Sequence, residues 1–184
     1  MVTSIKHTLV ALVEDKPGVL NRVSSLFRRR VFNIESIAVG HSEVPGLSRM
    51  TIVVDGANTA VEQVVKQLYK VIDVVKVSDI SKDNMVAREL ALVKVRATPA
   101  NRGEIMEIVD IFRANIVDVA PDSVMVEITG DEGKIESLLD LLKGFGVKEL
   151  VRTGRVAMVR GTSGSSPIDG ESVQEITRRR KKKG

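Results

Sequence analysis

Residues 6–20 read KHTLVALVEDKPGVL, and this stretch decides the fold. Residues 6–13 are apolar on much of both faces, which is typical of a strand in the centre of a sheet. Pro17 suits the first turn of a helix, because its fixed φ and missing N–H cost no helical hydrogen bond there. From Gly18 to Arg30 apolar residues recur at helical spacing on one face. The stretch therefore predicts a central strand, a short loop and an amphipathic helix.

The rest of the chain continues this pattern and then repeats it. In the first half we expect further strands at residues 33–39, 49–54 and 71–77 and a second helix at 58–69. Pro45-Gly46 indicates a turn between the first two of these strands. In the second half we expect strands at 89–96, 116–119, 124–128, 148–151 and 156–159, and helices at 101–112 and 133–145. Asn101 followed by Glu104 resembles a capping box at the start of a helix. The order β-α-β-β-α-β predicts an α+β protein with two tandem ferredoxin-like domains.

Composition divides the chain into two domains, a linker and a tail. We expect domains at 1–78 and 89–160, joined by the polar linker 79–88. The tail, 161–184, begins GTSGSSP and ends in a basic run, a composition typical of disorder. Each half has only about 80 residues, so it is marginal alone, and helices on one side of a sheet leave an open face and free edges. We therefore expect the first half to pair with a second copy as a homodimer.

The residue types argue against catalysis by this chain. There are no cysteines, which excludes disulfides, thiolate catalysis and cysteine metal sites. The two histidines, His7 and His41, are too few for a histidine-rich metal centre. We interpret His7 as a surface or edge residue and His41 as solvent-exposed. No nucleophile accompanies Glu14 and Glu35, so we expect no catalytic residue, no metal and no cofactor here.

Charge and hydropathy bear on partners and location. The net charge is +4, but the tail holds six basic residues against three acidic ones, so the folded part is almost neutral. A nucleic-acid surface is not indicated there, and the basic run has no interleaved aromatic residues for base stacking. No signal-peptide pattern and no apolar run of about 18 residues is present. We expect a cytoplasmic protein that touches no membrane.

The junction between the first strand and the first helix is the feature that carries chemistry. A helix N-terminus offers unpaired N–H groups and partial positive charge, which suit the carboxylate of a free amino acid. Gly18 would let that ligand approach the backbone, and Asp15 could take its ammonium group. The same residues could instead form an ordinary N-cap with proline in the first turn. The equivalent junction of the second half, residues 97–103, has no acid before its proline and no glycine just after it.

Several segments together resemble a known family. Residues 14–20 are similar to the fingerprint of the ACT domain, a ferredoxin-like amino-acid sensor. Together with further segments in the same order along the chain, they resemble the regulatory small subunit of acetolactate synthase, also called acetohydroxyacid synthase. The resemblance covers about residues 5–160, and its further segments are 26–27, 32–37, 47–52, 67–74, 88–94 and 111–119.

The resemblance implies a function and a partner. The catalytic subunit of that family carries thiamine diphosphate, Mg²⁺ and FAD, and joins two pyruvates, or pyruvate and 2-oxobutyrate, towards valine, leucine and isoleucine. The small subunit raises its activity and confers feedback inhibition, usually by valine. Family ligand sites lie between two ACT domains, which implies effector-binding residues at Asp15, Pro17, Gly18, Val19, Asn33 and Ile34. Some members have Asn in place of Asp15, which bears on ligand selectivity.

Two other functions stay open from sequence. One is a free-standing ACT-type sensor that controls transcription through the basic tail. The other is an enzyme whose site the sequence does not reveal. Asparagine is also common in turns before a strand, so the presence of Asn33 there does not require that it binds a ligand.

Overall fold

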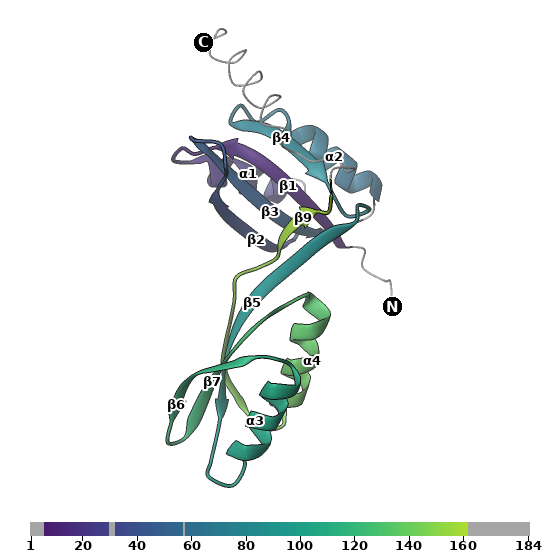
Figure 1. Ribbon diagram of the computed structural model, residues 1–184. Helices are drawn as coiled ribbons and strands as arrows, with labels where there is room; N and C mark the ends of the chain where they lie inside the picture. Colours follow the sequence, from purple (N-terminus) through teal and green to yellow (C-terminus); the bar gives the residue numbers. More distant parts are fainter. Residues whose placement is uncertain (1–5, 30–31, 57, 162–184) are drawn as a thin grey trace. The chain divides into compact units, whose positions relative to one another are not determined.

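The computed structural model describes residues 6–29, 32–56 and 58–161 (Figure 1). Its residues form two compact units, one holding the chain up to Val86 together with the segment from Ala157, and the other Ala87–Val156. Each unit is an α+β sandwich of a four-stranded antiparallel path and two helices, so the predicted tandem ferredoxin-like fold is confirmed. The basic run predicted to be disordered lies outside the described residues.

The first unit follows the predicted order. Its elements are β1 (Lys6–Glu14), α1 (Val19–Arg29), β2 (Ile34–His41), β3 (Leu47–Asp55), α2 (Asn58–Leu68) and β4 (Val74–Asp79). The strand order is β2-β3-β1-β4, with β1 antiparallel to both of its neighbours. Since β2 is also antiparallel to β3, β1 and β2 run in the same direction.

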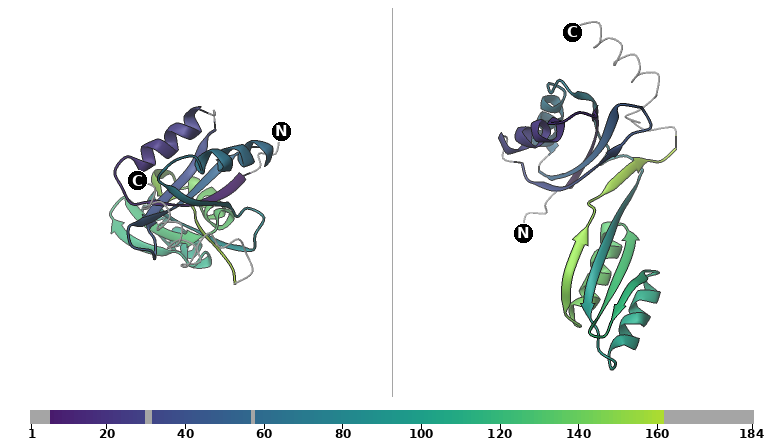
Figure 2. Two further views of the ribbon diagram at one scale, coloured as in Figure 1. Left: turned by 90° about the horizontal axis from the view of Figure 1, so that it is seen from above. Right: turned by 90° about the vertical axis from the view of Figure 1, so that its left-hand side faces the viewer.

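The core of this unit lies between the sheet and its two helices. Alternate residues of β1, Leu9, Ala11 and Val13, are buried there against Val23 and Phe27 of α1 and the apolar stripe of α2. Both helices cover the same face of the sheet (Figure 2). The single tyrosine, Tyr69, follows α2, and its hydroxyl donates a hydrogen bond to the carbonyl oxygen of Val77 at 2.7 Å.

The opposite face of this sheet was expected to be open, and at its centre that expectation is wrong. Thr8, Val10 and Val53 on this face are 0–2% exposed. Residues from the far end of the chain lie against it: Arg49 of β3 donates to the carbonyl oxygen of Ala157 at 3.0 Å. Ala157 belongs to β9 (Val156–Val159), which the sequence could not assign to a neighbour because the contact spans more than a hundred residues.

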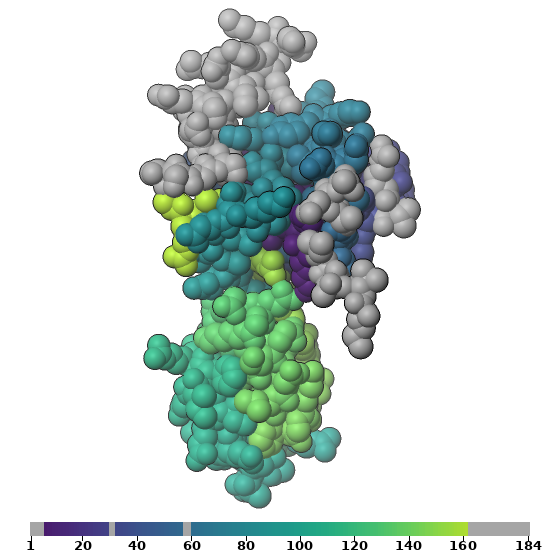
Figure 3. Space-filling view, turned by 90° about the vertical axis from the view of Figure 1, so that its right-hand side faces the viewer, coloured from purple at the N-terminus to yellow at the C-terminus, as the bar shows by residue number. Residues whose placement is uncertain are grey.

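The second unit repeats the layout. Its elements are β5 (Met85–Arg96), α3 (Arg102–Ile111), β6 (Asn115–Ala120), β7 (Ser123–Gly130), α4 (Glu132–Lys143) and β8 (Val147–Arg152), in the strand order β6-β7-β5-β8. Figure 3 shows α3 and α4 next to each other on the outside of this unit. Strand β5 begins at Met85, four residues before the predicted start at Glu89, because β9 provides it with a partner.

The predicted capping box at Asn101 is wrong. Asn101 makes no side-chain cap; its backbone is already helical, at φ −109° and ψ −4°, and its side-chain oxygen accepts from the N–H of Thr98 at 2.6 Å. An N-cap needs an extended backbone so that its side chain can reach the first free N–H groups. Asp131 meets that condition, with ψ 169°, and accepts from the N–H of Lys134 at 2.8 Å to cap α4.

His7 was expected at the surface, and this too is wrong. It is 2% exposed, because β1 lies between two strands and beneath the helices. Its Nδ1 lies 3.0 Å from Oδ2 of Asp79, and the other Asp79 oxygen accepts from the N–H and hydroxyl of Ser81. Partial burial alone would raise the pKa of Asp79, but the hydrogen bonds from Ser81 and His7 bring that pKa below its usual value. His41 is exposed, as expected.

We predict that Asp79→Asn destabilises the first unit at pH 7 by about 1 kcal/mol, because hydrogen bonds to a charged acceptor are lost. A carboxyl with a lowered folded-state pKa stabilises the fold above its unfolded pKa of about 3.9, and this contribution disappears as the pH falls through the folded value. Urea unfolding at pH 7 and at about pH 3 should therefore show a gap between wild type and variant that narrows in acid. The exposed Asp118, substituted by Asn, is the control; a gap of equal size at both pH values would show that the Asp79 charge is not responsible.

Candidate functional site

The predicted ligand loop, residues 15–18, is anchored at both sides by neighbouring strands. The N–H of Glu14 donates to the carbonyl oxygen of Asp73, just before β4, at 2.8 Å. The N–H of Asp15 donates to Gly46 in the β2–β3 turn at 2.9 Å. The loop therefore leaves the end of the central strand at a position fixed from both sides, and α1 begins directly after it (Figure 1).

Gly18 leaves the backbone accessible at the start of α1. Its φ is +85°, a conformation that residues with a Cβ adopt rarely. A Cβ built on Gly18 would meet only Nη2 of Arg22, at 3.8 Å, so the space in front of it is otherwise open. The space in front of this backbone therefore has room for an approaching atom, while ligand binding at Gly18 stays a prediction.

The N–H groups at this end of α1 are available to an acceptor. Pro17 has none, and that of Val19 makes only a long bond of 3.4 Å to Lys16. Those of Gly18, Leu20 and Asn21 find no acceptor among the described residues. Three free donors at the positive end of a helix can hold a carboxylate.

Asp15 does not cap the helix in this structure. Its carboxylate lies 3.2 Å from Nδ1 of His41, the last residue of β2, and no N–H of α1 is bonded to it within the described residues. Both side chains are accessible, with Asp15 46% exposed. The carboxylate is therefore accessible to a cation, and the alternative in which Asp15 is an ordinary N-cap does not hold among the described residues.

Two ion pairs surround the loop. Lys16 contacts Glu14 at 2.5 Å, and this neighbour raises the pKa of Lys16. Arg22 forms an ion pair with Asp73, whose side chain is only 8% exposed. The sequence analysis did not predict this pair, because Arg22 and Asp73 are 51 residues apart; a lone acid beside a buried strand, such as Asp73, was the available signal.

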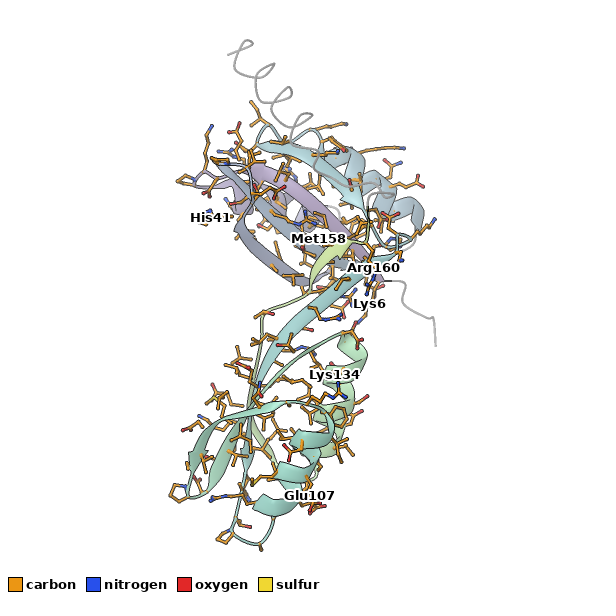
Figure 4. The ribbon with its side chains drawn as sticks, viewed as in Figure 1. Lys6, His41, Glu107, Lys134, Met158 and Arg160 are labelled. Atoms are coloured by element: carbon orange, nitrogen blue, oxygen red, sulfur yellow. The ribbon has the colours of Figure 1, made fainter. Side chains whose placement is uncertain are left out.

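The six predicted residues do not all meet in one chain. Asp15, Pro17, Gly18 and Val19 lie at the end of β1, although the side chain of Val19 is buried in the core. Asn33 and Ile34 lie at the start of β2, and Ile34 pairs with Val54 at the opposite end of the sheet. Because β1 and β2 run in the same direction, the two groups are separated by the length of β2, about 25 Å. Figure 4 shows this separation through His41 at one end of the sheet and Lys6 at the other.

Two apolar side chains near the first group were not predicted. Leu20, in the first turn of α1, is 49% exposed, and Val39, near the end of the edge strand β2, is 48% exposed. Val39 pairs with the core residue Met50, so it lies on the face of the sheet that α1 covers. These residues provide an apolar surface beside the polar loop.

The part of the chain that the structure describes contains neither a cluster of metal ligands nor a membrane-spanning helix. No group of three or more His, Cys, Asp or Glu side chains there is arranged to hold a metal ion. Among the helices that the structure describes, none is long and apolar enough to span a bilayer.

Comparison with known proteins places both units. Residues 9–76 match the AHAS small subunit-like ACT domain, and residues 88–161 match the family described as the small subunit of acetolactate synthase. A probable acetolactate synthase small subunit of Archaeoglobus fulgidus is 59% identical over 157 residues, which cover 85% of this chain and 98% of that protein. The acetolactate synthase small subunit of Bacillus subtilis is 51% identical, covering 86% of this chain and 92% of its own.

A solved structure agrees with these sequence matches. The crystal structure of the acetolactate synthase small subunit from Thermotoga maritima has a TM-score of 0.79 and 45% identity, and covers 86% of this chain and 99% of that one. Family, sequence and fold point to the same assignment. The chain belongs to the family of acetolactate synthase small subunits, with an ACT domain in its first half.

Proposed function

We propose that this chain is the non-catalytic regulatory subunit of acetolactate synthase and that it binds valine, or another branched-chain amino acid, at the β1–α1 junction. The observation that carries this proposal is the open helix start at Gly18, where free N–H groups lie next to the accessible carboxylate of Asp15. The effector's carboxylate binds the N–H groups of Gly18, Leu20 and Asn21, and its ammonium group binds Asp15. Leu20 and Val39 contact its apolar side chain.

The strength of these contacts suits a sensor. A helix dipole contributes about 0.3–1 kcal/mol and charge-assisted hydrogen bonds contribute more, so with apolar contact the site should reach micromolar to millimolar affinity. An apolar pocket separates ligands that differ by one methylene by only about 1–3 kcal/mol. Valine, leucine and isoleucine are therefore all tested as effectors.

A second copy of the chain completes the site. Strand β2 is an edge strand of the sheet, so its outer backbone groups can pair with another strand. Antiparallel pairing of two β2 strands about a twofold axis places the start of one strand next to the end of the other. Asn33 and Ile34 of one copy then approach Asp15 and Gly18 of the second copy. The two groups of residues therefore come together across the dimer interface, although they lie at opposite ends of the sheet within one chain. We assign this role to the first domain, residues 1–78.

The regulated partner is the catalytic subunit, with its thiamine diphosphate, Mg²⁺ and FAD. It joins two pyruvates, or pyruvate and 2-oxobutyrate, and the small subunit both activates it and makes it sensitive to the effector. The names of the relatives support this partnership. Effector binding orders the dimer interface, and surfaces of the first domain and of the second, residues 89–160, transmit the change. A coupling free energy of about 1–3 kcal/mol corresponds to roughly 5–150-fold in affinity.

The site is tested by calorimetric titration of valine, leucine and isoleucine into the full chain and into Gly18→Asp. The new carboxylate would occupy the ligand's carboxylate position and repel it, so we expect binding by wild type and a loss of at least about tenfold in the variant. The matched control is Gly103→Asp, which adds the same charge in the first turn of α3, where no ligand is proposed. Equal binding by all three proteins would show that the site lies elsewhere.

The link to the catalytic subunit is tested by measuring effector affinity with and without that subunit. Thermodynamic linkage requires that, if the effector changes subunit association, the subunit changes effector affinity by the same factor. We expect the affinity to differ by roughly 5–150-fold between the two measurements. Identical affinities, together with a catalytic subunit whose activity is unaffected by this chain, would refute the regulatory role.

A further inference from the structure

The proposed effector site contains a second ionisable group that faces Asp15. His41 is the last residue of β2, and its Nδ1 lies 3.2 Å from the Asp15 carboxylate of the same chain. Its side chain is 87% exposed, so it makes this contact without being packed in place. The imidazole therefore stands where a ligand's ammonium group would approach the same carboxylate.

We propose that His41 belongs to the effector site, and that in its protonated form it competes with the effector's ammonium group for Asp15. The proposal rests on the proposed function and adds to it a pH dependence of effector binding. The effector would bind more weakly as the pH falls, because a charged imidazole occupies its ammonium partner.

The competition follows from the chemistry of the three groups. Imidazolium and ammonium are both single positive charges that donate hydrogen bonds, so each repels the other when both approach one carboxylate. Histidine is the side chain that changes charge between about pH 5 and 8. When His41 is neutral it no longer repels an approaching ammonium group, and Asp15 is available to the ligand.

The other charged groups around His41 are carboxylates, a lysine and an arginine. The loop before α1 carries Glu14 and Lys16, which pair with each other at 2.5 Å. The β2–β3 loop carries Glu43, which attracts Arg49 of β3, although burial is the larger influence and lowers the pKa of Arg49. Carboxylates, lysines and arginines as classes do not titrate between about pH 5.5 and 7.5. His7, the other histidine, lies at the opposite end of β1, where it pairs with Val54. A change in effector binding over this interval that is absent in His41→Gln therefore reports the His41 imidazole.

The exposure of the His41 and Asp15 side chains limits how much the effector affinity can change with pH. Ion pairs between exposed side chains are weak and screened by salt. We therefore expect a change of about two- to fivefold in the dissociation constant, larger at low ionic strength.

The experiment is calorimetric titration of L-valine into the full chain at pH 5.5 and pH 7.5. We expect wild type to bind about two- to fivefold more tightly at pH 7.5. His41→Gln should bind equally at both pH values, close to wild type at pH 7.5, and His41→Lys should bind weakly at both. The comparison ligand 3-methylbutanoate, which is valine without its ammonium group, should not lose affinity in His41→Lys.

Two results would overturn the proposal. One is a pH dependence in His41→Gln as large as that of wild type. The other comes from nuclear magnetic resonance of the His41 ring at pH 5.5 without any ligand: the pairing requires the ring resonances to move in Asp15→Asn, and unchanged resonances exclude it. Failure of every variant to bind valine at either pH would instead count against the proposed function, whereas the ring resonances still decide whether His41 and Asp15 interact.

Discussion

The structure depends on the double pairing of β1. Leu9, Val10, Ala11 and Leu12 are fully buried, so the backbone groups between them have no access to water and must be paired on both sides. Strands β3 and β4 provide those partners over most of its length. The chain can leave this position only beyond Glu14, where the same two neighbours hold the loop through Asp73 and Gly46. The free start of α1 is thus a consequence of where the central strand ends.

The order of helices and strands was predictable because it rests on local periodicity. Alternation in the strands and the 3.6-residue spacing in the helices are properties of short segments, and they identified both units. The predictions that were wrong concern features that depend on contacts between residues distant in sequence. His7 is buried because β4, more than sixty residues later, lies beside it and Asp79 accepts its hydrogen bond. The early start of β5 depends on β9 in the same way, and so does the contact of Arg49 with Ala157 on the face of the first sheet that was expected to be open.

The candidate site shows the same division. Asp15, Pro17 and Gly18 are neighbours in sequence, and the expectation of an open helix start agrees with the geometry of Gly18. Asn33 was grouped with them through a family resemblance. Only the common direction of β1 and β2 shows that, within one chain, Asn33 lies at the opposite end of the sheet from them. His41 and Asp73 could not be placed from sequence, because each lies at or next to the end of a strand whose register is set by tertiary pairing, and Arg22 of α1 meets Asp73 only through that pairing. The Asn101 error arose differently: the residue type was right for a cap, but its backbone conformation was not.

The position of Tyr69 gives this protein an intrinsic optical reporter. With one tyrosine and no tryptophan in the chain, near-ultraviolet emission comes almost wholly from a single ring. That ring is half exposed and its hydroxyl donates to Val77 in β4, so its signal changes when α2 separates from this edge of the first sheet. Emission therefore follows the half that contains the ACT domain, while far-ultraviolet circular dichroism follows both halves. Comparing the two signals during unfolding separates the stabilities of the two units without any added label.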